Sequence, residues 1–274
     1  MTPTIHLVRH GQGYHNISIH SQHLRDPELT PLGEQQCFEL RDSFPDHDKI
    51  THLVASPLRR TLSTCLVAFA PAVARTGKII ALPDSQELSL YDCDRGTDVE
   101  TLRAEFGERV DLALVPPGWN SKGCEERQPT VANLIVRARR VRLWLRDLAL
   151  TTTLAATGSN DTAEREGRDV QIVLVTHGGF LHFLIEDWDG IPQRKGTGWA
   201  NAEIRSYTFA DATGQDSEAS LKETDSSWTR RRGQDVPLTV AEQLDLREAY
   251  SRALDAETAM VEKELAEMET STVA

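Results

Sequence analysis

A group of basic side chains stands beside the ends of predicted strands and helices, where it could do chemistry. The group comprises Arg9, His10 and Gly11 after the first apolar run, Arg59 and Arg60 at the start of a helix, and His177 and Gly178 after a later apolar run. Sites in open α/β sheets form at the carboxyl ends of strands, so we expect these residues to converge. The planar guanidinium group of arginine donates two parallel hydrogen bonds to phosphate oxygens. The first turn of a helix adds backbone N–H groups that have no partner within the helix. The pattern therefore predicts a positively charged pocket that binds a phosphate dianion.

A histidine in such a pocket can act as a nucleophile. A neutral imidazole nitrogen can attack phosphorus and form a phosphohistidine, which divides one difficult step into two. The reaction also needs an acid that protonates the leaving oxygen and then, as a base, activates water. Glu87 follows the predicted strand at residues 79–83 and suits that role, while Asp92 and Asp94 lie close enough in sequence to replace it. The sequence leaves the choice among the three carboxyl groups open.

Short apolar runs alternate with helical stretches along the chain. The predicted strands cover residues 5–8, 52–55, 78–82, 170–175 and 204–209, and the predicted helices cover about 31–43, 57–70 and 131–150. Thr30-Pro31 and Ser56-Pro57 each place an N-cap residue before a proline, which marks a helix start. Several strands are apolar on both faces, as in a sheet covered by helices on both sides. These features predict an α/β fold, with surface loops at the polar stretches 151–168 and 211–235.

Charge and composition narrow the possible partners. The chain has 274 residues and a net charge of −12. This acidic excess repels nucleic-acid phosphates and anionic membranes, so we expect no nucleic acid and no membrane as partner. No run of 18 apolar residues and no signal-peptide pattern is present. The four cysteines lack C-x-x-C spacing and are expected to be reduced thiols, so we expect a cytoplasmic location.

The C-terminal segment at residues 237–274 carries half of the net charge, with nine acidic and three basic side chains. Thr239 and Glu242 form a capping box, and apolar residues from Leu246 to Met268 recur at helical spacing. This predicts an acidic helix beyond a catalytic domain at residues 1–236. We expect the helix to pack on that domain, with a homodimer or docking of a protein partner as the alternative.

Three other patterns are weaker. Residues 11–16 begin like the glycine-rich loop of dinucleotide-binding folds but lack the third glycine, so an NAD-dependent oxidoreductase is discounted. His177 with two glycines is similar to an esterase oxyanion loop, but no G-x-S-x-G nucleophile elbow occurs. His20 and His23 lack a further ligand at a recognisable spacing, so no metal site is expected. His15 is expected on the loop surface or lining a pocket.

Five motifs, in order, resemble the histidine phosphatase superfamily, the group that contains cofactor-dependent phosphoglycerate mutase and related phosphatases. They are Leu7-Val-Arg-His-Gly-Gln12, Leu29-Thr-Pro-Leu-Gly-Glu-Gln-Gln36, Ser56-Pro-Leu-Arg-Arg60 with Thr64, Gln86-Glu-Leu88 and Val175-Thr-His-Gly-Gly179. The resemblance covers about residues 4–210. It implies a three-layer α/β/α sandwich with a mostly parallel central sheet and a variable cap insertion at about residues 88–130. No metal and no cofactor are expected, because arginines supply the charge that Mg²⁺ supplies elsewhere.

The resemblance also implies a role for each matched residue. His10 would be the nucleophile and Glu87 the proton donor. The phosphoryl group would be held by Arg9, Arg60 and His177. Further substrate contacts are expected from Gly11, Gln12, Tyr14, Asn16 and Gly178.

Departures from the mutase pattern favour hydrolysis. Mutases of the family carry E-R-H-Y-G around the acid, where this chain has Gln86-Glu-Leu-Ser-Leu-Tyr91, and R-H-G-E-S where it has Arg9-His-Gly-Gln-Gly13. The first stretch and Phe180-Leu-His-Phe183 are more similar to a fungal branch of small phosphatases. We therefore expect a phosphatase that acts on a small phosphorylated metabolite, a monoester or a diphosphate. A phosphoglycerate mutase-type phosphotransferase and a non-catalytic scaffold are the alternatives.

Overall fold

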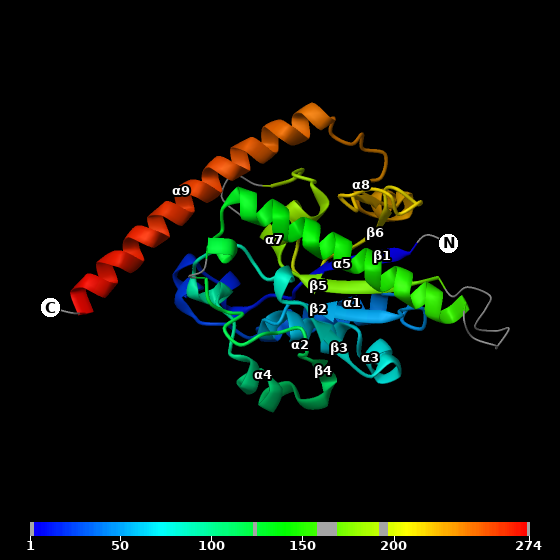
Figure 1. The fold of residues 1–274 in the computed structure, drawn as a ribbon, viewed down its shortest axis with the longest axis horizontal. Helices are drawn as coiled ribbons and strands as arrows, with labels where there is room; N and C mark the ends of the chain where they lie inside the picture. Colours follow the sequence, from blue (N-terminus) through cyan, green and yellow to red (C-terminus); the bar gives the residue numbers. More distant parts are fainter. Residues whose placement is uncertain (1–2, 123–124, 158–168, 192–196, 273–274) are drawn as a thin grey trace.

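A seven-stranded sheet forms the centre of the computed structural model, which describes residues 3–122, 125–157, 169–191 and 197–272. The strands are β1 Thr4–Arg9, β2 His52–Ala55, β3 Ile79–Ala81, β4 Val110–Asp111, β5 Gln171–Thr176, β6 Ile204–Phe209 and β7 Leu221–Glu223. Their order is β4-β3-β2-β5-β1-β6-β7 (Figure 1). The pairs from β4 across to β1 are parallel, and β6 and β7 add an antiparallel edge. The expected mostly parallel sheet is confirmed.

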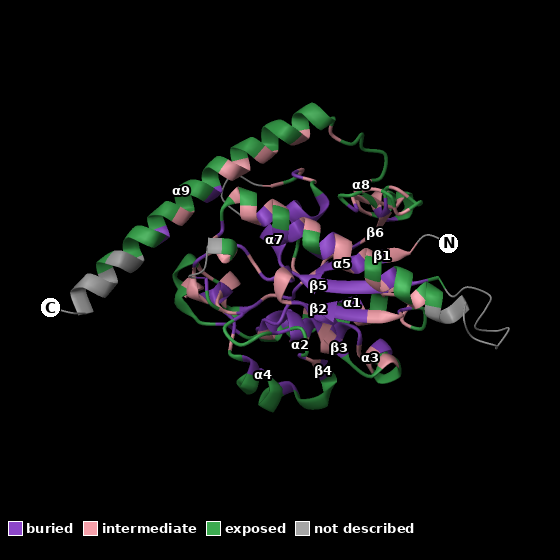
Figure 2. Ribbon diagram, in the orientation of Figure 1, coloured by how far each residue is buried: buried purple, intermediate pink, exposed green. Residues whose placement is uncertain are grey.

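Helices cover both faces of this sheet. They are α1 Pro31–Ser43, α2 Arg59–Ala68, α3 Ala70–Thr76, α4 Val99–Phe106, α5 Val131–Thr157, α7 Gly178–Ile185, α8 Asp225–Arg232 and α9 Val240–Thr272. Ile172 and Leu174 of β5 join one apolar core with α5 and α7, while Val173 and Val175 join a second core with α1 to α4. Because successive side chains of a strand point to opposite faces, both faces of β5 are buried (Figures 1 and 2). The three-layer α/β/α architecture is confirmed.

The two predicted proline-marked helix starts have different outcomes. α1 begins at Pro31 as expected, and the Thr30 hydroxyl accepts a hydrogen bond from the Gly33 N–H at 3.0 Å. α2 begins at Arg59, two residues after the predicted start, and its N-cap residue, Leu58, provides no side-chain cap. The N-cap interpretation of Ser56 is therefore wrong. Ser56 lies buried just after β2, and its hydroxyl bonds to the His177 ring instead.

The two predicted loops contain regular structure. α5 continues through residues 151–157, and residues 158–168 lie outside the described residues. The stretch 211–235 contains β7, which pairs with β6, and α8, which is capped by Thr224. The loop interpretation failed there because a short edge strand and a small surface helix can be built almost entirely from polar residues.

The C-terminal helix α9 follows the capping box, in which the Thr239 N–H donates to Glu242 Oε2 at 2.8 Å. It runs diagonally past the body of the protein, and most of its surface is exposed (Figures 1 and 2). Leu254 and Val261 are buried, whereas Leu246 is exposed and does not line the packed face as expected. No helix in the described ranges, α9 included, is long and apolar enough to cross a membrane.

Candidate active site

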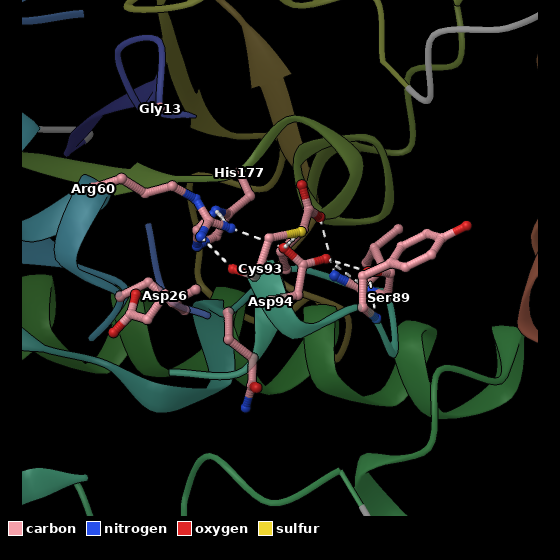
Figure 3. Close-up of polar contacts among 12 residues, drawn as sticks. Gly13, Asp26, Arg60, Ser89, Cys93, Asp94 and His177 are labelled. Carbon is pink, nitrogen blue, oxygen red and sulfur yellow. Dashed lines mark hydrogen bonds and ion pairs between the residues drawn. The ribbon is translucent and has the colours of Figure 1, made fainter. Parts of the chain in front are cut away.

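The predicted convergence occurs at the carboxyl ends of β1 and β5, which lie side by side in the sheet. His10 follows β1 and His177 follows β5, and their ring centroids are 5.2 Å apart. Arg60, in the first turn of α2, reaches both rings, and Figure 3 shows its side chain beside that of His177. Its Nε lies 3.3 Å from His10 Nε2, and its Nη2 lies 3.2 Å from His177 Nδ1. Three residues from distant parts of the chain thus form one buried cluster.

The ring of His10 is held in one tautomer. Its Nδ1 lies 2.6 Å from the Gly11 carbonyl oxygen, which can only accept, so Nδ1 carries the proton. Burial and the positive charge of Arg60 hold the pKa of His10 well below its usual value. The ring is therefore neutral, with a lone pair on Nε2. A neutral imidazole with a free Nε2 lone pair is the form that can act as a nucleophile.

Arg60 is anchored by a buried carboxylate, which contacts the same Nη2 that lies near His177. Its Nη2 lies 2.9 Å from Asp94 Oδ1, with side-chain exposures of 0% and 6%, and its Nη1 donates to the Cys93 carbonyl at 2.6 Å. Asp94 also accepts from the Ser89 hydroxyl at 2.5 Å (Figure 3). Burial alone would raise the pKa of Asp94, but the charges of Arg60 and Lys122 outweigh it and lower that pKa. Asp94 is therefore an anion that orients Arg60.

The pKa of the Glu87 carboxyl group is raised, whereas that of Asp94 is lowered. Its carboxyl oxygens accept hydrogen bonds from the Gly179 N–H at 3.1 Å and the Phe180 N–H at 2.9 Å, at the start of α7. Burial and the negative charge of Asp94 raise the pKa of Glu87. Two carboxyl groups whose pKa values are driven apart are suited to different roles, and the one with the raised pKa suits a proton donor. Asp92 lies in an ion pair with Arg95 at 3.7 Å and is half-exposed.

The loop after His10 is held by contacts to α1, α2 and the residue before α1, and by one hydrogen bond within the loop. The Gly11 N–H donates to Thr64 Oγ1 at 3.0 Å, and a Cβ at Gly11 would lie 2.7 Å from the Gly33 carbonyl oxygen. The Gln12 side chain accepts from the Thr30 hydroxyl at 2.8 Å. Asn16 Oδ1 accepts from the Gly13 N–H at 3.0 Å. These side chains thus hold the shape of the loop beside His10.

The remaining predicted site residues differ in their exposure. Arg9 is bonded through Nη1 to the Trp199 carbonyl at 2.5 Å, and its buried Nε has no partner among the described residues. Gly178 is buried, and a Cβ there would meet the Thr197 side chain at 2.6 Å. Tyr14 is 42% exposed and lies on the outer part of the loop. Arg9 and Gly178 thus adjoin His10 and His177 in the chain and are shielded from solvent to different degrees, whereas Tyr14 is exposed.

His15, which the sequence placed on the loop surface or in the lining of a pocket, lies beside His10, a position that the sequence did not predict. Its ring centroid lies 5.4 Å from that of His10. Burial and Arg60 lower the pKa of His15 to about 3, and its buried Nδ1 has no partner in the described part of the chain. A Cβ at Gly13 would lie 2.8 Å from the His15 ring. Glycine at that position leaves room for the ring.

The weaker sequence patterns do not form sites in the structure. Residues Tyr14–Asn16 make one 3₁₀ turn, so the loop after β1 does not lead directly into the helix N-terminus that a dinucleotide pyrophosphate requires. His20 and His23 are exposed, and no group of three potential metal ligands occurs among the described residues.

A buried cluster of histidines and an arginine, at the carboxyl ends of a mostly parallel sheet in a three-layer α/β fold, is typical of enzymes that act on phosphate groups. The chain belongs to the histidine phosphatase superfamily, branch 1, whose family model matches residues 5–220. The expected family is confirmed, and so is membership of an enzyme class that includes phosphatases.

Relatives of known name are spread over plants and yeast. The chain is 28% identical over 263 residues to phosphoglycerate mutase-like protein 1 of Arabidopsis thaliana, covering 85% of this chain and 90% of the relative. It is 24% identical over 204 residues to sedoheptulose 1,7-bisphosphatase of Saccharomyces cerevisiae, covering 71% and 70%. Among solved structures, a mycobacterial glucosyl-3-phosphoglycerate phosphatase is similar with a TM-score of 0.47 and 19% identity, covering 81% of this chain and 97% of that one.

Proposed function

We propose that this protein is a metal-independent phosphatase that hydrolyses a small phosphate monoester or diphosphate through a phosphohistidine on His10. The observation that carries the proposal is the fixed tautomer of His10. Its Nδ1 is committed to the Gly11 carbonyl at 2.6 Å, and its Nε2 faces the guanidinium of Arg60 at 3.3 Å. A phosphoryl group bound to Arg60 would therefore lie next to the nucleophilic lone pair.

In the first step, His10 Nε2 attacks phosphorus and forms an N–P bond while the bond from phosphorus to the leaving oxygen breaks. The protonated carboxyl of Glu87 gives its proton to that oxygen, so the product leaves as an alcohol. Arg60, Arg9 and His177 stabilise the charge on the phosphoryl oxygens. Before this step the phosphoryl group must take over the Arg60 N–H that bonds to His10 in the free protein.

In the second step, water attacks the phosphohistidine. The Glu87 carboxylate accepts a proton from the water, the N–P bond breaks, and its electron pair returns to the imidazole. Inorganic phosphate leaves, and Glu87 is again protonated. The raised pKa of Glu87 supports this alternation, because the carboxyl group must hold a proton in one step and give it up in the other.

The first experiment is hydrolysis of p-nitrophenyl phosphate in EDTA by the wild-type protein and by His10→Ala, with circular dichroism to show that both are folded. We expect turnover by the wild type and none by the variant. A protein with full activity after His10→Ala would contradict the proposal, as would activity that EDTA removes. Transfer of ³²P from metabolite phosphates to His10 would then identify the intermediate.

The substrate panel follows from the relatives and from the alternative of a mutase. Because one relative is a sugar bisphosphatase, sugar phosphates belong in the panel, together with phosphoglycerates. Release of inorganic phosphate supports a phosphatase. Transfer of the phosphoryl group between positions of a phosphoglycerate would instead support the mutase alternative.

A further inference from the structure

Three side chains, from β5, from α5 and from the loop that contains Lys122, hold the backbone of the short segment Ser85–Glu87, which ends in the proposed proton donor. Thr176 Oγ1 of β5 donates to the Ser85 carbonyl at 2.6 Å. Arg137 Nη2 of α5 donates to the Gln86 carbonyl at 3.0 Å. Lys122 Nζ donates to the Glu87 carbonyl at 3.0 Å. The segment lies outside any strand, so these bonds replace the ladder that would otherwise fix its backbone.

Lys122 is the unusual member of the three. It is only 4% exposed, and it forms no ion pair with a carboxylate among the described residues. Burial and the nearby charge of Arg137 lower the pKa of Lys122 to about 7, although Asp94 and Glu87 favour its charged form. Burying an ammonium group without an ion pair costs free energy. A residue kept at that cost is a candidate for a role in the reaction.

We propose that Lys122 is a positioning residue that holds the Glu87 carboxyl in place for proton transfer to the leaving oxygen. The proposal rests on the function proposed above. Lys122 fixes the peptide of Glu87 from one side, while the Gly179 and Phe180 N–H groups fix its carboxyl from the other. Proton transfer requires the donor within hydrogen-bond reach of the leaving oxygen, so a small shift of this peptide weakens the acid. Lys122 belongs to the segment at residues 88–130, so it also connects the expected cap to the acid.

The test compares two substrates that differ in their need for an acid. A p-nitrophenolate leaves without a proton, whereas the alkoxide of β-glycerophosphate needs one. Glu87→Gln gives the reference pattern, a larger loss on β-glycerophosphate than on p-nitrophenyl phosphate. We expect Lys122→Met to show the same pattern. Its kcat should fall about 10- to 100-fold on β-glycerophosphate and by less than about threefold on p-nitrophenyl phosphate, with little change in either KM.

A conservative variant separates the position of Glu87 from the stability of the fold. Lys122→Arg keeps a donor that is long enough to reach the Glu87 carbonyl, so it should retain most of the β-glycerophosphate activity; it carries the test if Lys122→Met does not fold. Lys78→Met, at an exposed lysine paired with Glu108, is the control for loss of a lysine elsewhere. Equal losses on both substrates, or no loss on either, would overturn the role of Lys122. Absence of turnover by the wild type on both substrates would overturn the proposed function itself.

Discussion

The Nη2 of Arg60 and the Oδ1 of Asp94 lie 2.9 Å apart in an ion pair that is almost completely excluded from solvent. The pair fixes the guanidinium between His10 and His177 before any substrate binds. The same Nη2 also lies 3.2 Å from His177 Nδ1, so a phosphoryl group bound as proposed above would replace the contacts of Arg60 to the two histidines while Asp94 keeps the guanidinium in place.

Loss of this ion pair should lower the stability of the folded protein. Asp94→Asn leaves Arg60 buried without its carboxylate, and breaking a buried pair costs about 3–5 kcal/mol. We expect the free energy of unfolding, measured in urea, to fall by about 3 kcal/mol. The control is Glu108→Gln, which removes the exposed pair with Lys78 and should change stability by less than about 1 kcal/mol. An Asp94→Asn protein as stable as the control would contradict the anchoring role.

The activity should fall at both ends of the pH range. Above the raised pKa of Glu87 the carboxyl is deprotonated and cannot protonate the leaving oxygen, so kcat/KM on an aliphatic phosphate decreases as the pH rises. At low pH the protonation of His10 removes the nucleophile, but its lowered pKa places this loss well below the usual histidine range. Glu87→Gln should abolish the decrease on the basic side. A profile of this variant with the wild-type basic limb would show that another group is the acid.

Substitutions of His15 and Gly13 should weaken phosphate binding through the same ring, so their effects should not add. The His15 Nδ1 has no partner among the described residues and can donate to a phosphoryl oxygen, so His15→Ala should raise the inhibition constant of inorganic phosphate about tenfold. Gly13→Ala places a Cβ 2.8 Å from the ring and should displace it, with a similar effect. The double variant should then be little worse than either single one. Fully additive effects would show that the two residues act separately.

Buried neutral histidines should make the fold sensitive to acid. His15 and His182 have pKa values of about 3 and about 4, lowered mainly by burial, and those of His10 and His177 are also well below normal. Below pH ~6.5 the unfolded chain binds protons that the folded chain does not, so stability falls as the pH falls from ~6.5 toward 4. Each such histidine contributes up to about 1.4 kcal/mol per pH unit in this window. Unfolding by urea at a series of pH values measures the slope. His182→Gln should reduce it, and a flat profile would contradict the prediction.

The sequence predicted most of the sheet because apolar runs such as 52–55 and 204–209 are short and bounded by polar residues, and both match β2 and β6 residue for residue. It missed α7, in which every residue from Gly178 to Ile185 is buried, because a helix that is apolar all round lacks the one-sided periodicity that marks a surface helix. β4 has only two residues and carries no periodic signal.

The sequence likewise predicted some residues of the site and missed others. His10, Arg60 and His177 were predicted because each stands next to the end of an apolar run or in the first turn of a predicted helix, and sheet topology brings such ends together. The residues alone left the choice between Glu87 and Asp94 open, and only the family resemblance favoured Glu87, since the choice depends on which carboxyl contacts Arg60 and which contacts the N–H groups of α7. Lys122 was missed because its bond to the Glu87 carbonyl joins two loops that no local pattern connects.

The C-terminal helix offers a last test, which bears on its two expected roles. Leu254 is 6% exposed within the core that includes Phe183 and Trp188, so Leu254→Ala should lower the free energy of unfolding by about 2–4 kcal/mol. Leu244, on the same helix, is 55% exposed, and Leu244→Ala should change stability by less than about 0.5 kcal/mol. If α9 packs on its own chain, the loss at Leu254 will not depend on protein concentration. A loss that varies with concentration would show that α9 packs on a second copy, because dimer stability follows mass action.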